Sequence, residues 1–307
     1  MKRLLVTGLD GFVGLHVKQA LEGSQSSRYR LAMPREAIEL TNPETIARAI
    51  EDTHPECVLH LAAQSFVPAS LKDPRPTYEV NFFGTLNLLQ ALKTNGFCGR
   101  MLYVGSAEVY GAVRTEDLPI TESCPLRPRS PYGVSKAAAE LLCYQWTQTQ
   151  NMDIVMARPF NHVGPGQATH FVVPDFASQL TEIKLGRRDP MIRVGNIDVT
   201  RDFTDVRDVV EAYFALIEDG EAGEAYNVCS GHEYGVRDVL SELIRLTGID
   251  CEIVVDENRL RSAEQRRACG SFEKLARRAG WTPRIALSES LRDVLAYCEE
   301  KLKMGNK

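Results

Sequence analysis

The most constraining feature of the sequence is a glycine-rich segment that directly follows a short apolar run at the N-terminus. The run RLLVT ends at Thr7, and glycines follow in a G-x-x-G-x-x-G pattern. A strand that turns tightly into a helix presents free backbone N–H groups and the positive end of the helix dipole to an anion. Glycines permit the tight turn, the approach of a pyrophosphate and the packing of helix on strand. The segment is either a simple glycine-rich turn or, as we predict, a dinucleotide cradle formed by Gly8, Gly11, Phe12, Val13 and Gly14.

Strand-like apolar runs alternate with segments of helical periodicity along the first half of the chain. Apolar runs predict strands at 3–7, 29–33, 57–61, 101–104 and 154–158, and helical spacing predicts helices at 12–21, 77–95 and 131–150. Such alternation is typical of parallel strands covered by helices on both faces. We therefore predict an α/β fold with a Rossmann-type doubly wound parallel sheet.

The alternation loosens after Arg158. Residues 160–202 contain many glycines and prolines, and regular structure is expected again as a helix at 208–218, a strand at 225–228 and a helix at 288–303. We expect a nucleotide-binding domain at 1–160 plus about 202–230. A smaller C-terminal substrate-binding lobe would then come from about 161–201 and 231–307.

Composition excludes several other classes of protein. The formal net charge of −5 argues against a nucleic-acid partner. The eight cysteines form no C-x-x-C pair, so we expect neither a metal site nor a disulfide framework. The N-terminal apolar run is too short for a signal peptide, and no stretch is long enough to span a membrane. We expect a cytoplasmic protein.

Two further motifs point to proton transfer near the sheet. Tyr132 and Lys136 form a Y-x-x-x-K pattern at the start of a predicted helix, where a spacing of four places both on one face. A phenol with a pKa of about 10 needs a nearby cation to stabilise its anion. Tyr132 would thus act as general acid or base, with Lys136 lowering its pKa and holding the nicotinamide ribose. Ser106 follows the strand at 101–104, at the edge where ligands of doubly wound sheets bind.

The choice between NADP(H) and NAD(H) depends on the end of the second strand. An acid there binds the ribose 2′-hydroxyl, whereas an arginine accommodates a 2′-phosphate. The segment LAMPREAIEL has no Asp, and Arg35 is its only cation. Arg35 either favours NADP(H) or is a solvated loop residue, and NAD(H) remains the alternative cofactor.

Taken together, these motifs resemble the extended short-chain dehydrogenases/reductases over essentially the whole chain. The stretches HLAAQSFVPAS, NFFGTLNLLQAL, SAEVYG, RPFNHVGPGQ, FVVPDFA, RDFTDVRDVV, YNVCSG and RSAEQRR further resemble GDP-6-deoxy-4-keto-D-mannose reductases. That family implies NAD(P)H-dependent reduction of the C4 ketone of GDP-4-keto-6-deoxy-D-mannose to GDP-D-rhamnose, a precursor of bacterial surface polysaccharide such as O-antigen. It also implies a homodimer held by a four-helix bundle.

The resemblance assigns roles to matching residues. Ser106, Tyr132 and Lys136 would be catalytic. Leu61, Ala62 and Ala63 would line the cofactor channel, and Glu39 would stand where the family has an Asp facing adenine. The GDP-sugar would contact Ser106, Asn161 and Val172, and its phosphates and ribose would be held by Arg201, Arg261 and Glu264. Without the resemblance, these arginines could equally form a solvated basic face.

Glu108 leaves an alternative open. The sister GDP-mannose 4,6-dehydratases carry a Glu two positions after the catalytic hydroxyl residue, as Ser106 and Glu108 are spaced here. That hydroxyl residue is typically a threonine in the dehydratases, and FVVPDFA and AEQRR fit the reductases better. We therefore favour the reductase over a dehydratase that uses Glu108 as its base. A nucleotide-sugar 4-epimerase and a non-catalytic NAD(P) sensor are further alternatives, although the sensor is disfavoured by the presence of both Tyr132 and Lys136.

Overall fold

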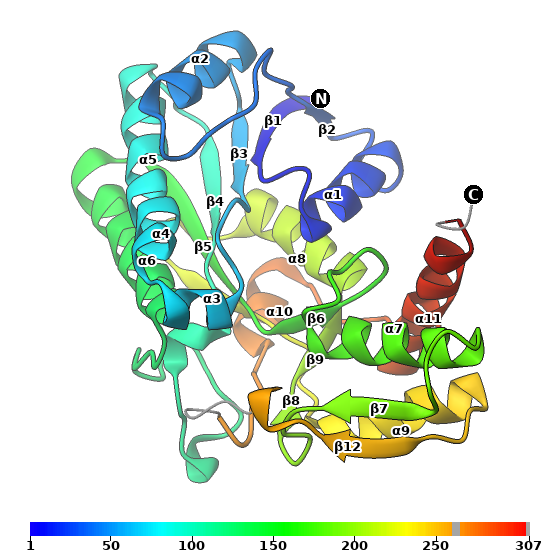
Figure 1. Ribbon diagram of the computed structural model, residues 1–307. Coiled ribbons are helices and arrows are strands. Elements are labelled where there is room, and N and C mark those ends of the chain that lie inside the picture. The colour runs from blue at the N-terminus through cyan, green and yellow to red at the C-terminus, as the bar shows by residue number, and fades with distance from the viewer. Residues whose placement is uncertain (260–264, 305–307) are drawn as a thin grey trace.

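A six-stranded parallel sheet forms the centre of the protein (Figure 1). The computed structural model describes residues 1–259 and 265–304. The strand order is β10-β5-β4-β3-β1-β2, and the strands are β1 (Lys2–Thr7), β2 (Tyr29–Leu31), β3 (Cys57–His60), β4 (Arg100–Val104), β5 (Asp153–Pro159) and β10 (Ala225–Val228). The chain runs outward from β1 to β2 and then returns to β3 on the other side of β1, so the order reverses there. The predicted doubly wound parallel sheet is confirmed.

Helices cover both faces of this sheet. One face packs on α1 (Phe12–Glu22) and α8 (Val206–Asp219), and the other packs on α2 (Pro43–Thr53), α5 (Gly84–Thr94) and α6 (Pro131–Gln150). The central strands are apolar on both sides because each face is buried. The short helix α10 (Glu273–Ala279) adds Leu275 to the core beneath α8. In the described part of the chain, no helix is long and apolar enough to cross a membrane.

A separate hydrophobic core lies in the lower right of Figure 1. It is formed mainly by α7 (Val172–Lys184), α9 (Val236–Thr247), α11 (Leu287–Met304) and β7 (Met191–Val194), and β7 pairs with β12 (Glu252–Val255). Two further short pairs are separate from the six-stranded sheet: β6 (Asn161–Val163) with β9 (Phe203–Asp205), and β8 (Thr200–Arg201) with β11 (Tyr234–Gly235). The residue boundaries of the two domains stay a prediction.

The helix predicted at 77–95 differs from the structure in its local winding. It is divided into α4 (Arg75–Tyr78), a π-helical turn η1 (Glu79–Phe83) and α5, and it follows the short helix α3 (Val67–Lys72). Inside the π turn, the Asn81 amide donates to Ser135 Oγ at 2.9 Å and to the Gln64 carbonyl at 3.0 Å. Hydrophobic spacing could not show this turn, because it depends on polar partners from α6 and from the segment after β3. Single 3₁₀ turns are η2 (Ala107–Tyr110), η3 (Thr115–Asp117) and η4 (Glu257–Arg259).

Candidate active site

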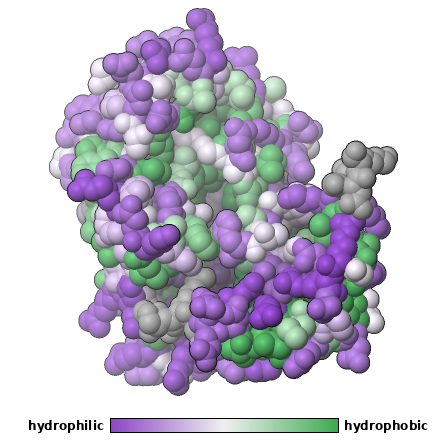
Figure 2. Space-filling model, viewed as in Figure 1, coloured by the Kyte–Doolittle hydropathy of each residue, from purple (hydrophilic) through white to green (hydrophobic). Residues whose placement is uncertain are grey.

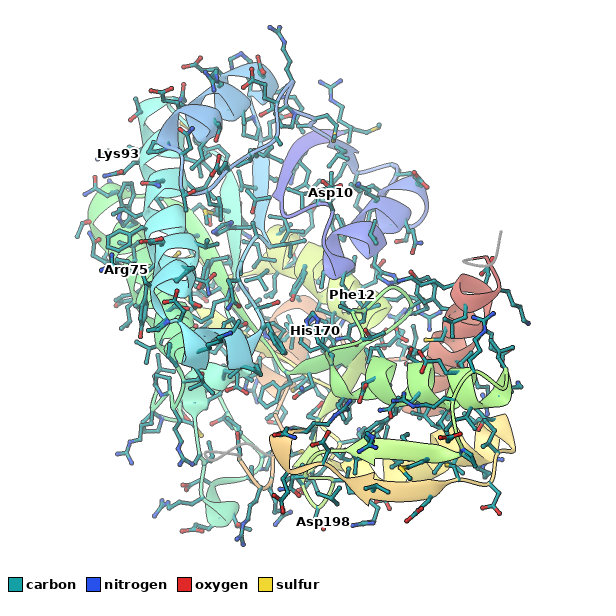
Figure 3. All side chains as sticks on the ribbon, viewed as in Figure 1. Asp10, Phe12, Arg75, Lys93, His170 and Asp198 are labelled. Atoms are coloured by element: carbon teal, nitrogen blue, oxygen red, sulfur yellow. The ribbon has the colours of Figure 1, made fainter. Side chains whose placement is uncertain are left out.

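A cleft of about 950 Å³ lies where the carboxyl ends of the central strands meet α7. Ligands of doubly wound sheets bind at this edge, next to the reversal of strand order. Phe12 and His170, labelled near the centre of Figure 3, come from the two sides of this cleft. Figure 2 shows apolar and neutral residues in the middle of the same face, surrounded by hydrophilic ones.

The glycine cradle forms one wall of the cleft, and its glycines meet different needs. Gly8 has a φ of +75°, and a Cβ there would stand 2.7 Å from the backbone N of Ala62. A Cβ on Gly14 would stand 2.3 Å from the Leu9 carbonyl oxygen, so Gly8 and Gly14 are required by the fold itself. A Cβ on Gly11 would meet only the Gly8 carbonyl oxygen, at 3.2 Å. Gly11 faces the cleft at the N-cap of α1, where a pyrophosphate needs room.

The segment after β3 forms the facing wall. Leu61, Ala62 and Ala63 line the cleft as the resemblance implies. Thr7 joins the two walls, because its Oγ1 accepts from the Ala62 N–H at 3.2 Å and contacts His60 Nδ1 at 2.7 Å. The cradle, its free N–H groups and this small-residue wall fit a dinucleotide cofactor.

Arg35 and Glu39 lie apart from the described cleft lining. Both side chains are exposed. Arg35 Nε pairs with an Asp52 carboxylate oxygen at 3.5 Å, and a Glu39 carboxylate oxygen accepts from the Thr41 hydroxyl at 3.2 Å. Their predicted contacts with the adenosine part of a cofactor stay predictions.

Ser106, Tyr132 and Lys136 come together at the floor of the cleft. Ser106 follows β4 and caps η2, while Ser130 caps α6 and Pro131 occupies its first turn. Tyr132 and Lys136 therefore lie in the first two turns of α6, and the Ser106 hydroxyl is near enough to the Tyr132 phenol to lower its pKa. The Lys136 Nζ donates to the Val104 carbonyl at 2.8 Å and lies 5.4 Å from the Tyr103 ring centroid. All three side chains are buried and line the cleft.

Burial controls the ionisation of this group. It raises the pKa of Tyr132 to about 12, and the nearby Ser106 hydroxyl only partly opposes this rise. Burial also lowers the pKa of Lys136 to about 8. The lowering of the Tyr132 pKa by Lys136 stays a prediction, and the Lys136 ammonium donates here to the Val104 carbonyl. Tyr132 is therefore a neutral phenol at pH 7 and suited to donate a proton.

Glu108 faces the cleft with an exposed side chain. Its backbone N–H donates to Ser106 Oγ at 3.2 Å, which orients the serine hydroxyl. Its carboxylate raises the pKa of Tyr132. The spacing that suggested a dehydratase base thus places Glu108 beside the reacting centre, and its role stays a prediction.

The residues predicted to bind substrate lie beyond Tyr132. Asn161 begins β6, Val172 begins α7, and Arg201 lies in β8, and all three line the cleft. The Arg201 Nη1 donates to the carbonyls of Thr200 and Gln265, at 2.7 and 2.8 Å. Arg261 and Glu264 fall outside the described residues.

His162 follows Asn161 and was a weak candidate for substrate contact, whereas His16 and Asp175 were not predicted as site residues. His162 stacks on Phe12 with ring centroids 5.9 Å apart, and His16 Nε2 contacts the Pro165 carbonyl oxygen at 2.8 Å. This connects the loop after β6 to the cradle helix. Asp175, in the quoted stretch FVVPDFA, also lines the cleft. Its position in an apolar helical segment was the only signal in the sequence. Within residues 1–259 and 265–304, no group of three or more His, Cys, Asp or Glu side chains could hold a metal ion.

Comparison with known proteins gives consistent matches over nearly the full length. The chain is 44% identical to the GDP-6-deoxy-D-mannose reductase of Pseudomonas aeruginosa over 302 residues, which covers 98% of this chain and 99% of that protein. It is 31% identical to the GDP-6-deoxy-D-talose 4-dehydrogenase of Aggregatibacter actinomycetemcomitans, covering 89% of this chain and 90% of that one. The solved structure of P. aeruginosa RMD complexed with NADPH superposes with a TM-score of 0.94 at 44% identity, covering 98% of this chain and 100% of that chain.

The family assignment rests on the breadth of these matches. Residues 5–294 match the family described as GDP-mannose 4,6 dehydratase. This range contains the cradle, the serine–tyrosine–lysine group and α7 at the far side of the cleft. The chain therefore belongs to the GDP-mannose 4,6-dehydratase family of extended short-chain dehydrogenases/reductases.

Proposed function

We propose that the protein reduces the C4 ketone of GDP-4-keto-6-deoxy-D-mannose to GDP-D-rhamnose with NADPH. The observation that carries this proposal is that Ser106, Tyr132 and Lys136 are all buried and line one cleft with the glycine cradle. The 44% identical relative is named as a reductase of this sugar type, and the matching solved structure contains NADPH.

The residues of the site divide the reaction between them. When bound in the cradle, NADPH supplies the hydride that converts the ketone to an alkoxide. Tyr132, protonated at neutral pH because its pKa is about 12, donates its proton to that oxygen. Ser106 donates a hydrogen bond to the same oxygen. Lys136 places a positive charge near the phenolate that Tyr132 becomes, before the proton is restored from solvent.

The configuration at C4 depends on which face of the ketone receives the hydride. The names of the two relatives differ at this carbon, because 6-deoxy-D-mannose and 6-deoxy-D-talose are C4 epimers. The identity of 44% against 31% supports the manno product, GDP-D-rhamnose.

A coupled assay tests this function directly. Purified protein, GDP-4-keto-6-deoxymannose and NADPH are mixed, absorbance at 340 nm is followed, and the sugar product is identified by NMR. We expect NADPH oxidation with formation of GDP-D-rhamnose. Tyr132→Phe should lower kcat by about 10²- to 10⁴-fold and leave NADPH affinity nearly unchanged. A Phe variant with a normal rate would refute the assignment of the acid.

Incubating the same purified protein with GDP-mannose tests the dehydratase alternative. GDP-mannose without added cofactor should remain unchanged. Formation of the 4-keto sugar from it, lost in Glu108→Gln, would instead assign Glu108 as a dehydratase base.

For the cofactor, we propose that Arg35 contributes to NADPH preference. Arg35 follows β2 and exposes its guanidinium, which can leave Asp52 for a 2′-phosphate. Arg35→Ala should raise the KM for NADPH and leave the KM for NADH unchanged. An equal effect on both cofactors would contradict this role.

We propose a homodimer that uses the outer face of α6 and the neighbouring π turn. Large apolar side chains are exposed there, namely Phe83, Val134, Leu141 and Tyr144. Burying such side chains against a second copy provides the main driving force for association. Leu141→Glu should therefore give a monomer in light scattering. Val255→Glu, at an equally exposed apolar residue on β12, is the matched control and should leave the mass unchanged.

We propose that the enzyme works in the cytoplasm and supplies GDP-D-rhamnose for surface polysaccharide. All eight cysteines are unpaired, as expected in a reducing compartment. Cell fractionation, together with analysis of O-antigen sugars in a deletion strain, tests both points.

A further inference from the structure

The cleft continues past Tyr132 into the second lobe, away from the glycine cradle. Its far end is lined by the first turn of α7, the loop after β7 and the turn η4, including Asp175, Asn196 and Asn258. If the C4 ketone lies at Tyr132 and the cofactor occupies the cradle, the nucleotide part of the substrate must extend toward this end. The inference below therefore rests on the proposed function.

Asp175 is an unusual residue at this end of the cleft. It lies in the first turn of α7 between Val172 and Phe176, and its side chain is mostly buried, at 20% exposure. Arg259 Nη1 and Gln179 Nε2 both donate to its Oδ2, at 2.5 and 2.9 Å. No described residue donates to Oδ1. One carboxylate oxygen is thus held in place while the other remains free.

The surrounding contacts fix the orientation of this carboxylate. The Gln179 amide also binds the backbone of Arg193 in β7, donating to its carbonyl at 2.9 Å and accepting from its N–H at 2.9 Å. Arg259 donates to the same carbonyl at 3.1 Å. Asp175 is therefore tied to β7 and η4 through Oδ2, and its free oxygen is preorganised for a donor from a ligand.

Among the common nucleobases, guanine offers the donors that such an oxygen needs. Its N1–H and 2-amino group point in the same direction along the Watson–Crick edge. Hypoxanthine lacks the amino group, adenine turns a bare ring nitrogen toward the carboxylate, and uracil flanks its single N–H with two carbonyls. A fixed acceptor that is partly desolvated discriminates strongly against bases that leave it unpaired.

We propose that Asp175 reads the Watson–Crick edge of the substrate's nucleobase and makes the cleft selective for guanine. Asp175 is thus a specificity-determining residue at the nucleotide end of the site, and it takes no part in hydride or proton transfer.

Calorimetric titration with free GDP, IDP, ADP and UDP tests the proposal without catalysis. We expect the wild-type protein to bind GDP about 10-fold more tightly than IDP and about 100-fold more tightly than ADP or UDP. Asp175→Asn should lose about 10-fold in GDP affinity and change ADP affinity little. Arg259→Gln is the matched control, because it removes the ion pair with Asp175 but keeps the carboxylate. It should retain the preference for GDP over ADP whatever its overall affinity.

The outcomes separate this inference from the proposed function. Wild-type protein that binds GDP and ADP equally, or an Asp175→Asn variant that keeps the wild-type ratio, would overturn the inference even if GDP-4-keto-6-deoxymannose is reduced. Guanine-selective binding that depends on Asp175, in a protein that reduces no 4-keto sugar, would support the inference and reject the proposed function. The comparison among bases on the wild type keeps the test decisive if the Asn variant fails to fold.

Discussion

Lys136 is buried in the cleft floor as a cation, and the stability of the fold should depend on its charge. Only 5% of the residue is exposed, and its Nζ donates to the Val104 carbonyl at 2.8 Å. Burial lowers its pKa from the ordinary 10.5 to about 8. We predict that Lys136→Met abolishes most activity and at the same time removes a pH-dependent cost to folding.

The magnitude follows from the two pKa values. A fall from 10.5 to about 8 corresponds to about 3 kcal/mol of folding free energy. Between these pH values the unfolded chain binds the lysine proton more tightly than the folded chain, so wild-type stability rises with pH in this window. The cost of burying the charge is complete only below pH 8. The stability of Lys136→Met relative to wild type should therefore fall by about 1 kcal/mol between pH 7 and pH 9.

Urea unfolding followed by circular dichroism at pH 7 and pH 9 measures this difference, at one protein concentration and without NADPH. The lost hydrogen bond to Val104 changes the absolute free energy but contributes little to its pH dependence. Lys274→Met is the matched control, because Lys274 also donates to a backbone carbonyl, at 2.8 Å, and lies over a tyrosine ring. Its ammonium is partly exposed and paired with Glu224. The stability difference between Lys274→Met and wild type should therefore be the same at pH 7 and pH 9. A constant difference between wild type and Lys136→Met at both pH values would refute the reasoning.

Three further predictions concern the cradle, the core and the pH profile. Gly14→Ala should lower the melting temperature, because its Cβ would stand 2.3 Å from a carbonyl oxygen. Gly11→Ala should leave the melting temperature unchanged but weaken NADPH binding, as measured by fluorescence titration. The reverse pattern would contradict these roles. Glu140→Gln should lower the free energy of unfolding, measured with urea, by about 3–5 kcal/mol, because it leaves the buried Arg158 guanidinium without its anion. A decrease below about 1 kcal/mol would mean that the ion pair is solvated. For reduction with saturating NADPH, kcat/KM should decline as pH rises through about 8, where Lys136 loses its charge, and a flat profile to pH 10 would exclude this dependence.

Much of the fold and of the reacting centre was readable from local sequence. The spacing of apolar residues along a strand or helix reflects which of its faces are buried. This spacing therefore predicted the parallel sheet and most of its helices. The glycine spacing and the Y-x-x-x-K pattern are contained within one turn and one helix. The geometry of both motifs therefore follows from local sequence alone. The structure places Gly8, Gly14, Tyr132 and Lys136 at the cleft, as these patterns predict.

Other properties were decided only by contacts between distant segments. The π turn at Asn81 depends on Ser135, 54 residues away, and burial, which only packing supplies, is the largest cause that raises the pKa of Tyr132. Asp175 looks like an ordinary helix residue until Arg259, 84 residues later, is brought against it. Sequence motifs determine what short segments can do, whereas desolvation and the pairing of remote polar groups arise only when the chain packs.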